Sequence, residues 1–160
     1  MPQNYKQDIL FIFPSEDGNF IYHLGAGYIL AYLKRRSITG SFFISDNSLG
    51  IVDLMNQIVD INPLVIGLTC FNSNYYLVKL IAKKLKIYFP KIKLVIGGPS
   101  ATFSDLLIMK DCPEIDLCVR REGEETTFQL INNFKKDSNA LDLIEGITFR
   151  KNKKIIQNRD

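Results

Sequence analysis

The sequence predicts an α/β domain built on a doubly wound, five-stranded parallel sheet, and three observations support this prediction. Short apolar runs alternate with longer amphipathic stretches along the chain. Several runs are continuously apolar, which is typical of parallel strands covered on both faces. One of them ends in Gly97-Gly98-Pro99, and the carboxyl edge of such a sheet is where ligands bind. The length of 160 residues, 46% of them hydrophobic, is enough for one domain with a core.

The strand and helix candidates alternate strictly. We expect strands at 9–13, 42–45, 64–69, 93–96 and 115–119. We expect helices at 24–36, 49–60, 75–88, 104–110 and 124–134. Five βα units in this order predict parallel strands joined by right-handed crossovers. Among the remaining topologies we favour the flavodoxin-like strand order 2-1-3-4-5.

The helix expected over 75–88 shows how such a helix covers a sheet. Val78, Ile81 and Leu85 recur at helical spacing, while lysines occupy the opposite face. Pro90 follows and ends the helix, because proline lacks the N–H that a helix interior requires.

The end of the chain has a different pattern. Gly146-Ile147-Thr148-Phe149-Arg150 is followed by a polar turn at 151–153 and then by Lys154-Ile155-Ile156. This pattern predicts a β-hairpin. We therefore expect a Rossmann-like domain over 1–140 and a hairpin or linker over 141–160, in a chain that is a fragment of a longer protein.

Composition limits the classes of partner. The net charge is +3, with lysines mainly on one helix and near the C-terminus, which favours a solvated helix face over a nucleic-acid surface. No apolar run approaches the ~20 residues of a membrane span. The apolar run near the start is too short for a signal peptide. We expect a soluble, cytoplasmic protein without a nucleic-acid or membrane partner. The irregular spacing of Cys70, Cys112 and Cys118 predicts buried free thiols rather than disulfides or a metal site.

Four loops converge at the carboxyl edge of the predicted sheet. Gly25 and Gly27 begin a helix, where free N–H groups bind a phosphate or a cofactor tail, although small residues there also permit close helix–strand packing. Thr69 ends a strand with a hydroxyl that binds a ligand or caps the strand. The candidate binding residues on these loops are Gly25, Ala26, Gly27, Thr69, Cys70, Phe71, Asn72, Gly97, Gly98, Pro99, Glu122, Gly123 and Glu124.

The residues of these loops favour a role in ligand binding over a role in catalysis. Glu122 and Glu124 open a helix, where the helix dipole stabilises carboxylates without any further role. The alternatives are that they bind ribose or amide hydrogen-bond donors, or that they act as an acid–base pair in catalysis. His23 is the only histidine, and a lone loop histidine is more often structural than a ligand or base. We therefore expect a binding module with no catalytic residues and no metal site of its own.

Five segments, taken in order, resemble the cobalamin-binding domain that precedes the radical SAM domain in B12-dependent radical SAM enzymes. The resemblance extends over residues 8–157. Its segments are 24–33, 62–69, 96–102, 121–126 and 145–150.

This resemblance implies a fold, a cofactor and a partner domain. The nucleotide tail of cobalamin would lie against Thr69-Cys70-Phe71 and Gly97-Gly98. The Asp-x-His-x-x-Gly motif of the classical cobalamin domains, whose histidine binds cobalt, is absent, since Ile21 precedes His23 by two positions and Ala26 follows it by three. In this respect the sequence resembles the radical SAM branch, which commonly lacks that histidine. The resemblance therefore implies base-off cobalamin without a histidine ligand, His23 being only a weak candidate for cobalt.

The cysteine motif of a radical SAM domain is absent from the 160 residues. The resemblance implies that S-adenosylmethionine and a 4Fe-4S cluster are bound by a downstream domain of the same longer chain. The implied reaction is methyl transfer to a small-molecule or peptide substrate, with the present segment non-catalytic. The alternatives are a degenerate domain that has lost the cofactor and acts as a scaffold or interaction module, and a flavin or nucleotide binder.

Overall fold

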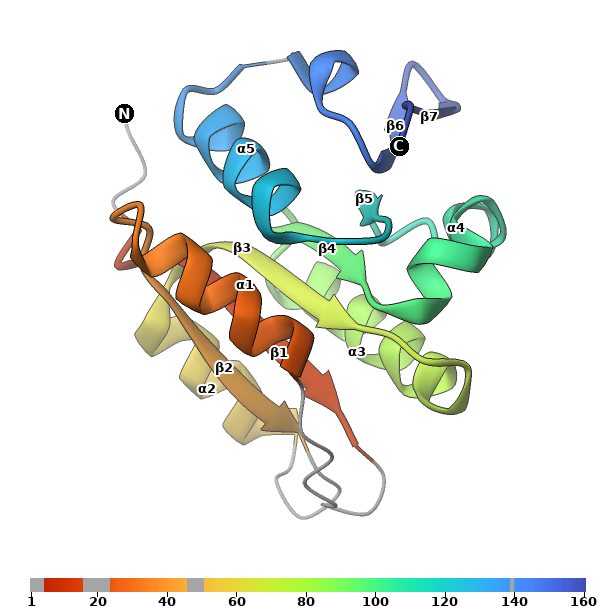
Figure 1. Ribbon diagram of the computed structural model, residues 1–160. Helices are drawn as coiled ribbons and strands as arrows, with labels where there is room; N and C mark the ends of the chain where they lie inside the picture. The colour runs from red at the N-terminus through yellow and green to blue at the C-terminus, as the bar shows by residue number, and fades with distance from the viewer. Residues whose placement is uncertain (1–4, 16–23, 46–50, 139) are drawn as a thin grey trace.

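The computed structural model describes residues 5–15, 24–45, 51–138 and 140–160 (Figure 1). Within these ranges, no helix combines the length and apolar character that crossing a membrane requires. The helices and strands in chain order are β1 (Gln7–Pro14), α1 (Leu24–Lys34), β2 (Gly40–Ser45), α2 (Ile51–Ile61), β3 (Pro63–Thr69), η1 (Asn72–Asn74), α3 (Tyr75–Tyr88), β4 (Lys93–Gly97), α4 (Pro99–Asp111), β5 (Leu117–Val119), α5 (Glu124–Lys135), η2 (Ala140–Leu143), β6 (Ile147–Lys151) and β7 (Lys154–Gln157).

One sheet organises all of these strands. Its order is β2-β1-β3-β4-β5-β6-β7, and β1 to β5 are parallel. The predicted order 2-1-3-4-5 is confirmed. The expected hairpin is present as β6 and β7, and it pairs antiparallel with β5, so it extends the same sheet to seven strands. Phe149 of β6 is buried in the core.

Helices cover both faces of the sheet (Figure 1). Along β3, Ile66 and Leu68 pack on the side of α2, α3 and α4, while Val65 packs on the side of α1 and α5. Successive strand side chains point to opposite faces, so a strand buried on both faces must be apolar at every position. This is why the continuously apolar runs predicted a covered parallel sheet.

The start of α4 differs from the expectation. The helix begins at Pro99 rather than at Ser104, and Ser104 has non-helical dihedrals, with a φ of −137°, at a kink inside it. Pro99 occupies the first helical position, where its missing N–H costs nothing and its fixed φ suits a helix. The segment Pro99–Phe103, which the sequence pattern leaves in a loop, is therefore helical.

Candidate functional site

A groove opens at the carboxyl edge of the sheet, on the face covered by α1 and α5. Strands β1, β3, β4 and β5 form its floor, and α1, α5 and the β5–α5 loop form its walls. Its cavity volume is about 140 Å³. An apolar cavity of about 150 Å³ holds a benzene ring, so this groove has room for a flat aromatic group.

Gly97 leaves one part of the groove floor free of side chains. Thr69 pairs with Gly97 across β3 and β4, and Gly67 pairs with Val95. By strand alternation all four face α1 and α5. A Cβ built on Gly97 would have no atom within 4 Å, so the space above this residue is open. A Cβ on Gly67 would lie 2.6 Å from Cδ1 of Phe11, so Gly67 instead makes room for that ring.

Gly98 has a different role from its neighbour Gly97. Its φ is +94° and its ψ −176°, a combination essentially restricted to glycine. A Cβ on Gly98 would lie 2.8 Å from the carbonyl oxygen of Cys70. That oxygen accepts a hydrogen bond from the N–H of Ser100 at 3.2 Å, and the N–H of Cys70 donates to Gly97 at 2.9 Å. Because Gly98 has no side chain, the backbone that follows β3 and the backbone that follows β4 can lie in contact beside the groove.

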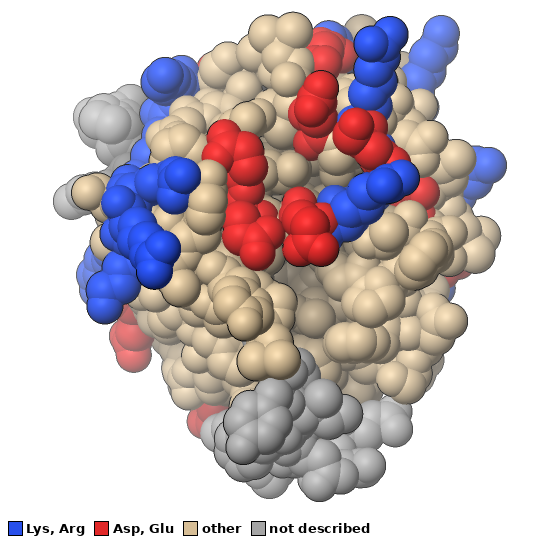
Figure 2. Space-filling model, viewed as in Figure 1, with Lys and Arg blue, Asp and Glu red and all other residues tan. Residues whose placement is uncertain are grey.

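The β5–α5 loop forms a further wall of the groove. Glu122, Gly123 and Glu124 line the groove together with Gly25 and Ala26 of α1. Gly123 is buried, and a Cβ on it would lie 2.8 Å from Cδ1 of Ile29, which shows how closely this loop packs on α1. Figure 2 shows acidic side chains gathered on this face beside a hollow in the surface. The groove thus has an apolar interior and a charged mouth, where Arg121 lies beside Glu122 and Glu124.

The structure brings most of the sequence-predicted residues to this groove. The candidates that line it are Gly25, Ala26, Thr69, Gly97, Gly98, Glu122, Gly123 and Glu124. The candidates that do not line it are Gly27, Cys70, Phe71, Asn72 and Pro99. His23 lies outside the described residues.

The candidates between β3 and α3 contact other parts of the fold. The N–H of Phe71 donates to the side-chain oxygen of Asn74 at 2.8 Å, and the Phe71 ring packs edge-on against Phe13. Asn72 accepts a hydrogen bond from the Ser100 hydroxyl at 2.8 Å. These contacts join the segment between β3 and α3 to β1 and to α4, and so support the edge of the sheet at which the groove opens.

The cysteines are free and buried, as predicted. Burial raises the pKa of the Cys70 and Cys112 thiols to about 11 in each case. Burial also raises the pKa of Cys118, and the nearby Asp105 carboxylate adds to the shift. The thiols therefore stay protonated near neutral pH, and a thiolate is the form that binds metals and attacks electrophiles.

Several groove residues escaped the sequence analysis. Phe11, Ile29 and Thr127 come from β1, α1 and α5, and each looks like an ordinary core position in the sequence. Arg121 also lines the groove, with a φ of +56°. A usable signal existed for Gly67, because an isolated glycine within a strand indicates close approach by another group.

Comparison with known proteins places these features in a family. The model of the B12 binding domain matches residues 15–131. An uncharacterized methyltransferase of Pyrococcus horikoshii, PH0819, is 34% identical over 103 residues, which are 64% of this chain and 22% of the relative.

Two solved structures share the fold. The radical S-adenosylmethionine methyltransferase TsrM of Kitasatospora setae, with cobalamin and an iron–sulfur cluster bound, has a TM-score of 0.81 at 12% identity, covering 96% of this chain and 29% of TsrM. The cobalamin-dependent S-adenosylmethionine radical enzyme OxsB, with aqua-cobalamin bound, has a TM-score of 0.76 at 21% identity, covering 96% and 22%.

The chain spans less than a third of the length of each of these relatives. The structural likeness, at low identity, establishes the shared fold. The family model covers most of the chain and includes the groove residues of α1, β3, β4, β5, α5 and the β5–α5 loop. The chain therefore belongs to the family of B12-binding domains.

Proposed function

We propose that this chain binds cobalamin and that its groove receives the nucleotide tail of the cofactor. The observation that carries the proposal is the open floor at Gly97, where a side chain would fill the space that a flat benzimidazole needs. Apolar residues surround that space, including Val95, Val119 and Leu130. Apolar walls with a few polar groups at the mouth are typical of cofactor sites.

The polar residues at the groove match the outer part of such a tail. Glu122 and Glu124 supply carboxylate oxygens, which accept hydrogen bonds from ribose hydroxyls or amide N–H groups. The Thr69 hydroxyl both donates and accepts. When bound, cobalamin supplies methyl-transfer chemistry, and the protein supplies position and electrostatics.

The larger protein is part of the same proposal. We infer that the chain belongs to a cytoplasmic radical SAM enzyme, in which a further domain holds S-adenosylmethionine and a 4Fe-4S cluster. That enzyme transfers a methyl group to a small-molecule or peptide substrate. The likeness to TsrM and PH0819, both described as methyltransferases, supports this reaction class.

Filling the floor of the groove tests the site directly. We expect the unaltered chain, mixed with hydroxocobalamin and desalted, to keep the cofactor's visible spectrum. Gly97→Leu should weaken retention by about 100-fold, because its side chain occupies the groove at a cost of more than 2 kcal/mol of binding free energy. No atom lies within 4 Å of the added Cβ, so the substitution creates no clash with the backbone, and circular dichroism should show that the variant is folded.

Ala31→Leu is the matched control, because Ala31 is exposed on α1 and does not line the groove. This variant should retain cobalamin like the unaltered chain. Equal retention by Gly97→Leu would contradict the placement of the tail. A colourless unaltered chain would instead favour a degenerate domain that acts as a scaffold, and a retained yellow colour would favour a flavin.

We further propose that cobalamin binds base-off and without a histidine ligand. The absence of the Asp-x-His-x-x-Gly motif around His23 supports this. Reduced to the cob(II) state, the bound cofactor should give an electron paramagnetic resonance spectrum without nitrogen splitting of the cobalt lines. His23→Ala should leave that spectrum unchanged. Nitrogen splitting that disappears in His23→Ala would show that the histidine is a ligand.

A further inference from the structure

The side chain of Arg120 is charged and deeply buried, and the proposed binding site does not use it directly. Arg120 lies between β5 and the groove wall 121–124, and its side chain is 4% exposed. Such burial of a guanidinium is costly, and apolar residues of similar volume often stabilise a protein as well or better. Its contacts indicate what this residue contributes instead.

Arg120 holds the segment that follows β7. Its Nε donates to Oδ1 of Asp160 at 2.9 Å, and Nη2 donates to the same oxygen at 2.5 Å and to the carbonyl oxygen of Asn158 at 2.6 Å. Its backbone N–H donates to Gly146, whose own N–H donates to the carbonyl oxygen of Arg159 at 2.6 Å. Nε and Nη2 thus converge on a single carboxylate oxygen, and hydrogen bonds between ionised partners are stronger than those between neutral groups.

The remaining nitrogen of the guanidinium, Nη1, is connected by hydrogen bonds to the hairpin and, through it, to α4. Nη1 donates to the Thr148 hydroxyl at 2.6 Å, and that hydroxyl donates to Asp105 of α4. Gln157 also donates to Asp105, at 2.7 Å. Arg120, Asp105 and Thr148 are all buried, so the surrounding structure constrains the position of each.

Asp160 connects this network to the groove. Its second oxygen, Oδ2, lies 2.8 Å from Nη2 of Arg121, a residue that lines the groove. The hydrogen bond from Arg120 lowers the pKa of the Asp160 carboxyl, so this group stays charged at neutral pH. The backbone N–H of Arg121 donates a hydrogen bond to the Thr102 hydroxyl of α4 at 2.9 Å. Arg121 is thus held through its backbone, whereas its side chain is 67% exposed and makes an ion pair at the surface.

We propose that Arg120 is a positioning residue, which sets the groove wall 121–124 for the cofactor by clamping the segment 157–160 against it. The proposal rests on the proposed function, because the wall it positions is one side of the cobalamin groove. It assigns to the hairpin and the residues after it a part in cofactor binding, without any contact between them and the cofactor.

The test compares Arg120→Gln with Lys86→Gln in the full chain. Lys86 is a matched control, because it pairs with Asp116 at 2.7 Å and donates to the Ile92 carbonyl, away from the groove lining. Hydrogen exchange of the amides at 121–126 and the Kd for hydroxocobalamin are measured for both. Arg120→Gln should speed exchange at 121–126 and raise the Kd by about tenfold, as for other residues that act through a network.

Lys86→Gln should leave both quantities unchanged even if it lowers the melting temperature. Asp160→Asn serves as a second variant, since this side chain is 34% exposed and its loss perturbs the core less. It should change exchange and Kd in the same direction by a smaller factor. Unchanged exchange, or faster exchange with an unchanged Kd, would overturn the proposal. If the unaltered chain binds no cobalamin, the proposed function fails, and the positioning of a cofactor site fails with it; exchange still shows whether Arg120 holds the wall.

Discussion

Gly98→Ala should destabilise the protein by about 3 kcal/mol, near the upper end of the cost of a strained backbone conformation. The residue has a φ of +94° and a ψ of −176°, which side chains do not tolerate. The added Cβ would also lie 2.8 Å from a backbone oxygen, that of Cys70, which cannot rotate away as a flexible side chain can. We expect the urea midpoint, followed by far-ultraviolet circular dichroism, to fall accordingly.

The neighbouring glycine provides the control. Gly97→Ala places a methyl group in open space, so its unfolding free energy should stay within about 1 kcal/mol of that of the unaltered chain. Gly98→Ala should also lose cobalamin, because β4, α4 and the backbone of Cys70 meet at this point of the groove edge. Equal stability of the two variants would contradict the close approach of the Gly98 and Cys70 backbones.

Asp105→Ala should destabilise the protein by about 3–5 kcal/mol, the usual cost of removing one partner from a buried ion pair. Asp105 is buried, accepts hydrogen bonds from Thr148 and Gln157, and lies 3.7 Å from Arg120. Its removal leaves both donors without this acceptor and a guanidinium with less compensating charge. Urea unfolding measures the change.

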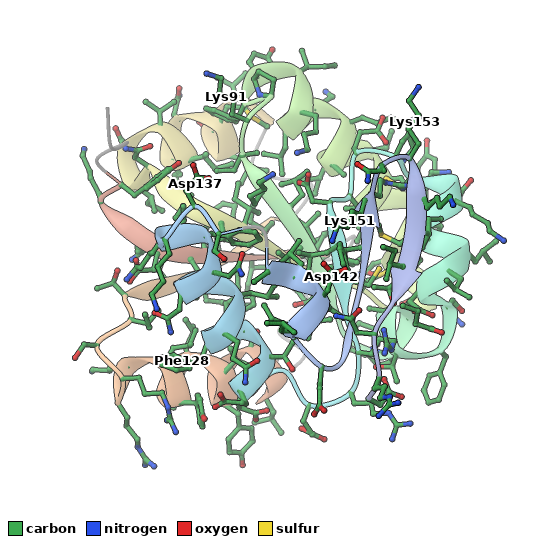
Figure 3. The ribbon with its side chains drawn as sticks, turned by 90° about the horizontal axis from the view of Figure 1, so that it is seen from above. Lys91, Phe128, Asp137, Asp142, Lys151 and Lys153 are labelled. Carbon is green, nitrogen blue, oxygen red and sulfur yellow. The ribbon has the colours of Figure 1, made fainter. Side chains whose placement is uncertain are left out.

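A surface aspartate is the matched control for this prediction. Asp142 of η2 pairs with Lys151 of β6, and Figure 3 shows the two side chains beside one another. Both are 44% exposed, so the ion pair is screened by water. Asp142→Ala should therefore cost at most about 1 kcal/mol. A similar loss in both variants would show that burial of Asp105 does not set its importance.

Much of the fold could be predicted because the required information is local. Each apolar run and each helical spacing belongs to a few consecutive residues, and handedness rules then leave few ways to order five βα units. The start of α4 was harder to predict from the sequence. Gly98-Pro99 indicates a turn as strongly as a helix start, and the structure places the first helical residue at Pro99.

The candidate site was predictable in part for the same reason. Strand ends of a parallel sheet meet at one edge, so Thr69, Gly97 and Glu122 could be expected together. The roles of adjacent residues could not be separated. Gly97 and Gly98 are equivalent in the sequence, yet one leaves space for a ligand and the other permits two backbone segments to lie in contact.

The sequence by itself determined the parallel strands, the helices between them and the edge at which a cofactor would bind, because periodicity and glycine at strand ends act over short stretches of chain. It favoured the order of the five parallel strands, and the tertiary structure added β6 and β7 to the same sheet. The tertiary structure decided which side chains share the groove and what supports its walls. The Phe11 ring over Gly67 and the guanidinium of Arg120 between Asp105 and Asp160 join residues far apart in the chain. Such contacts depend on how complete elements pack, and no local pattern in the sequence carries that information.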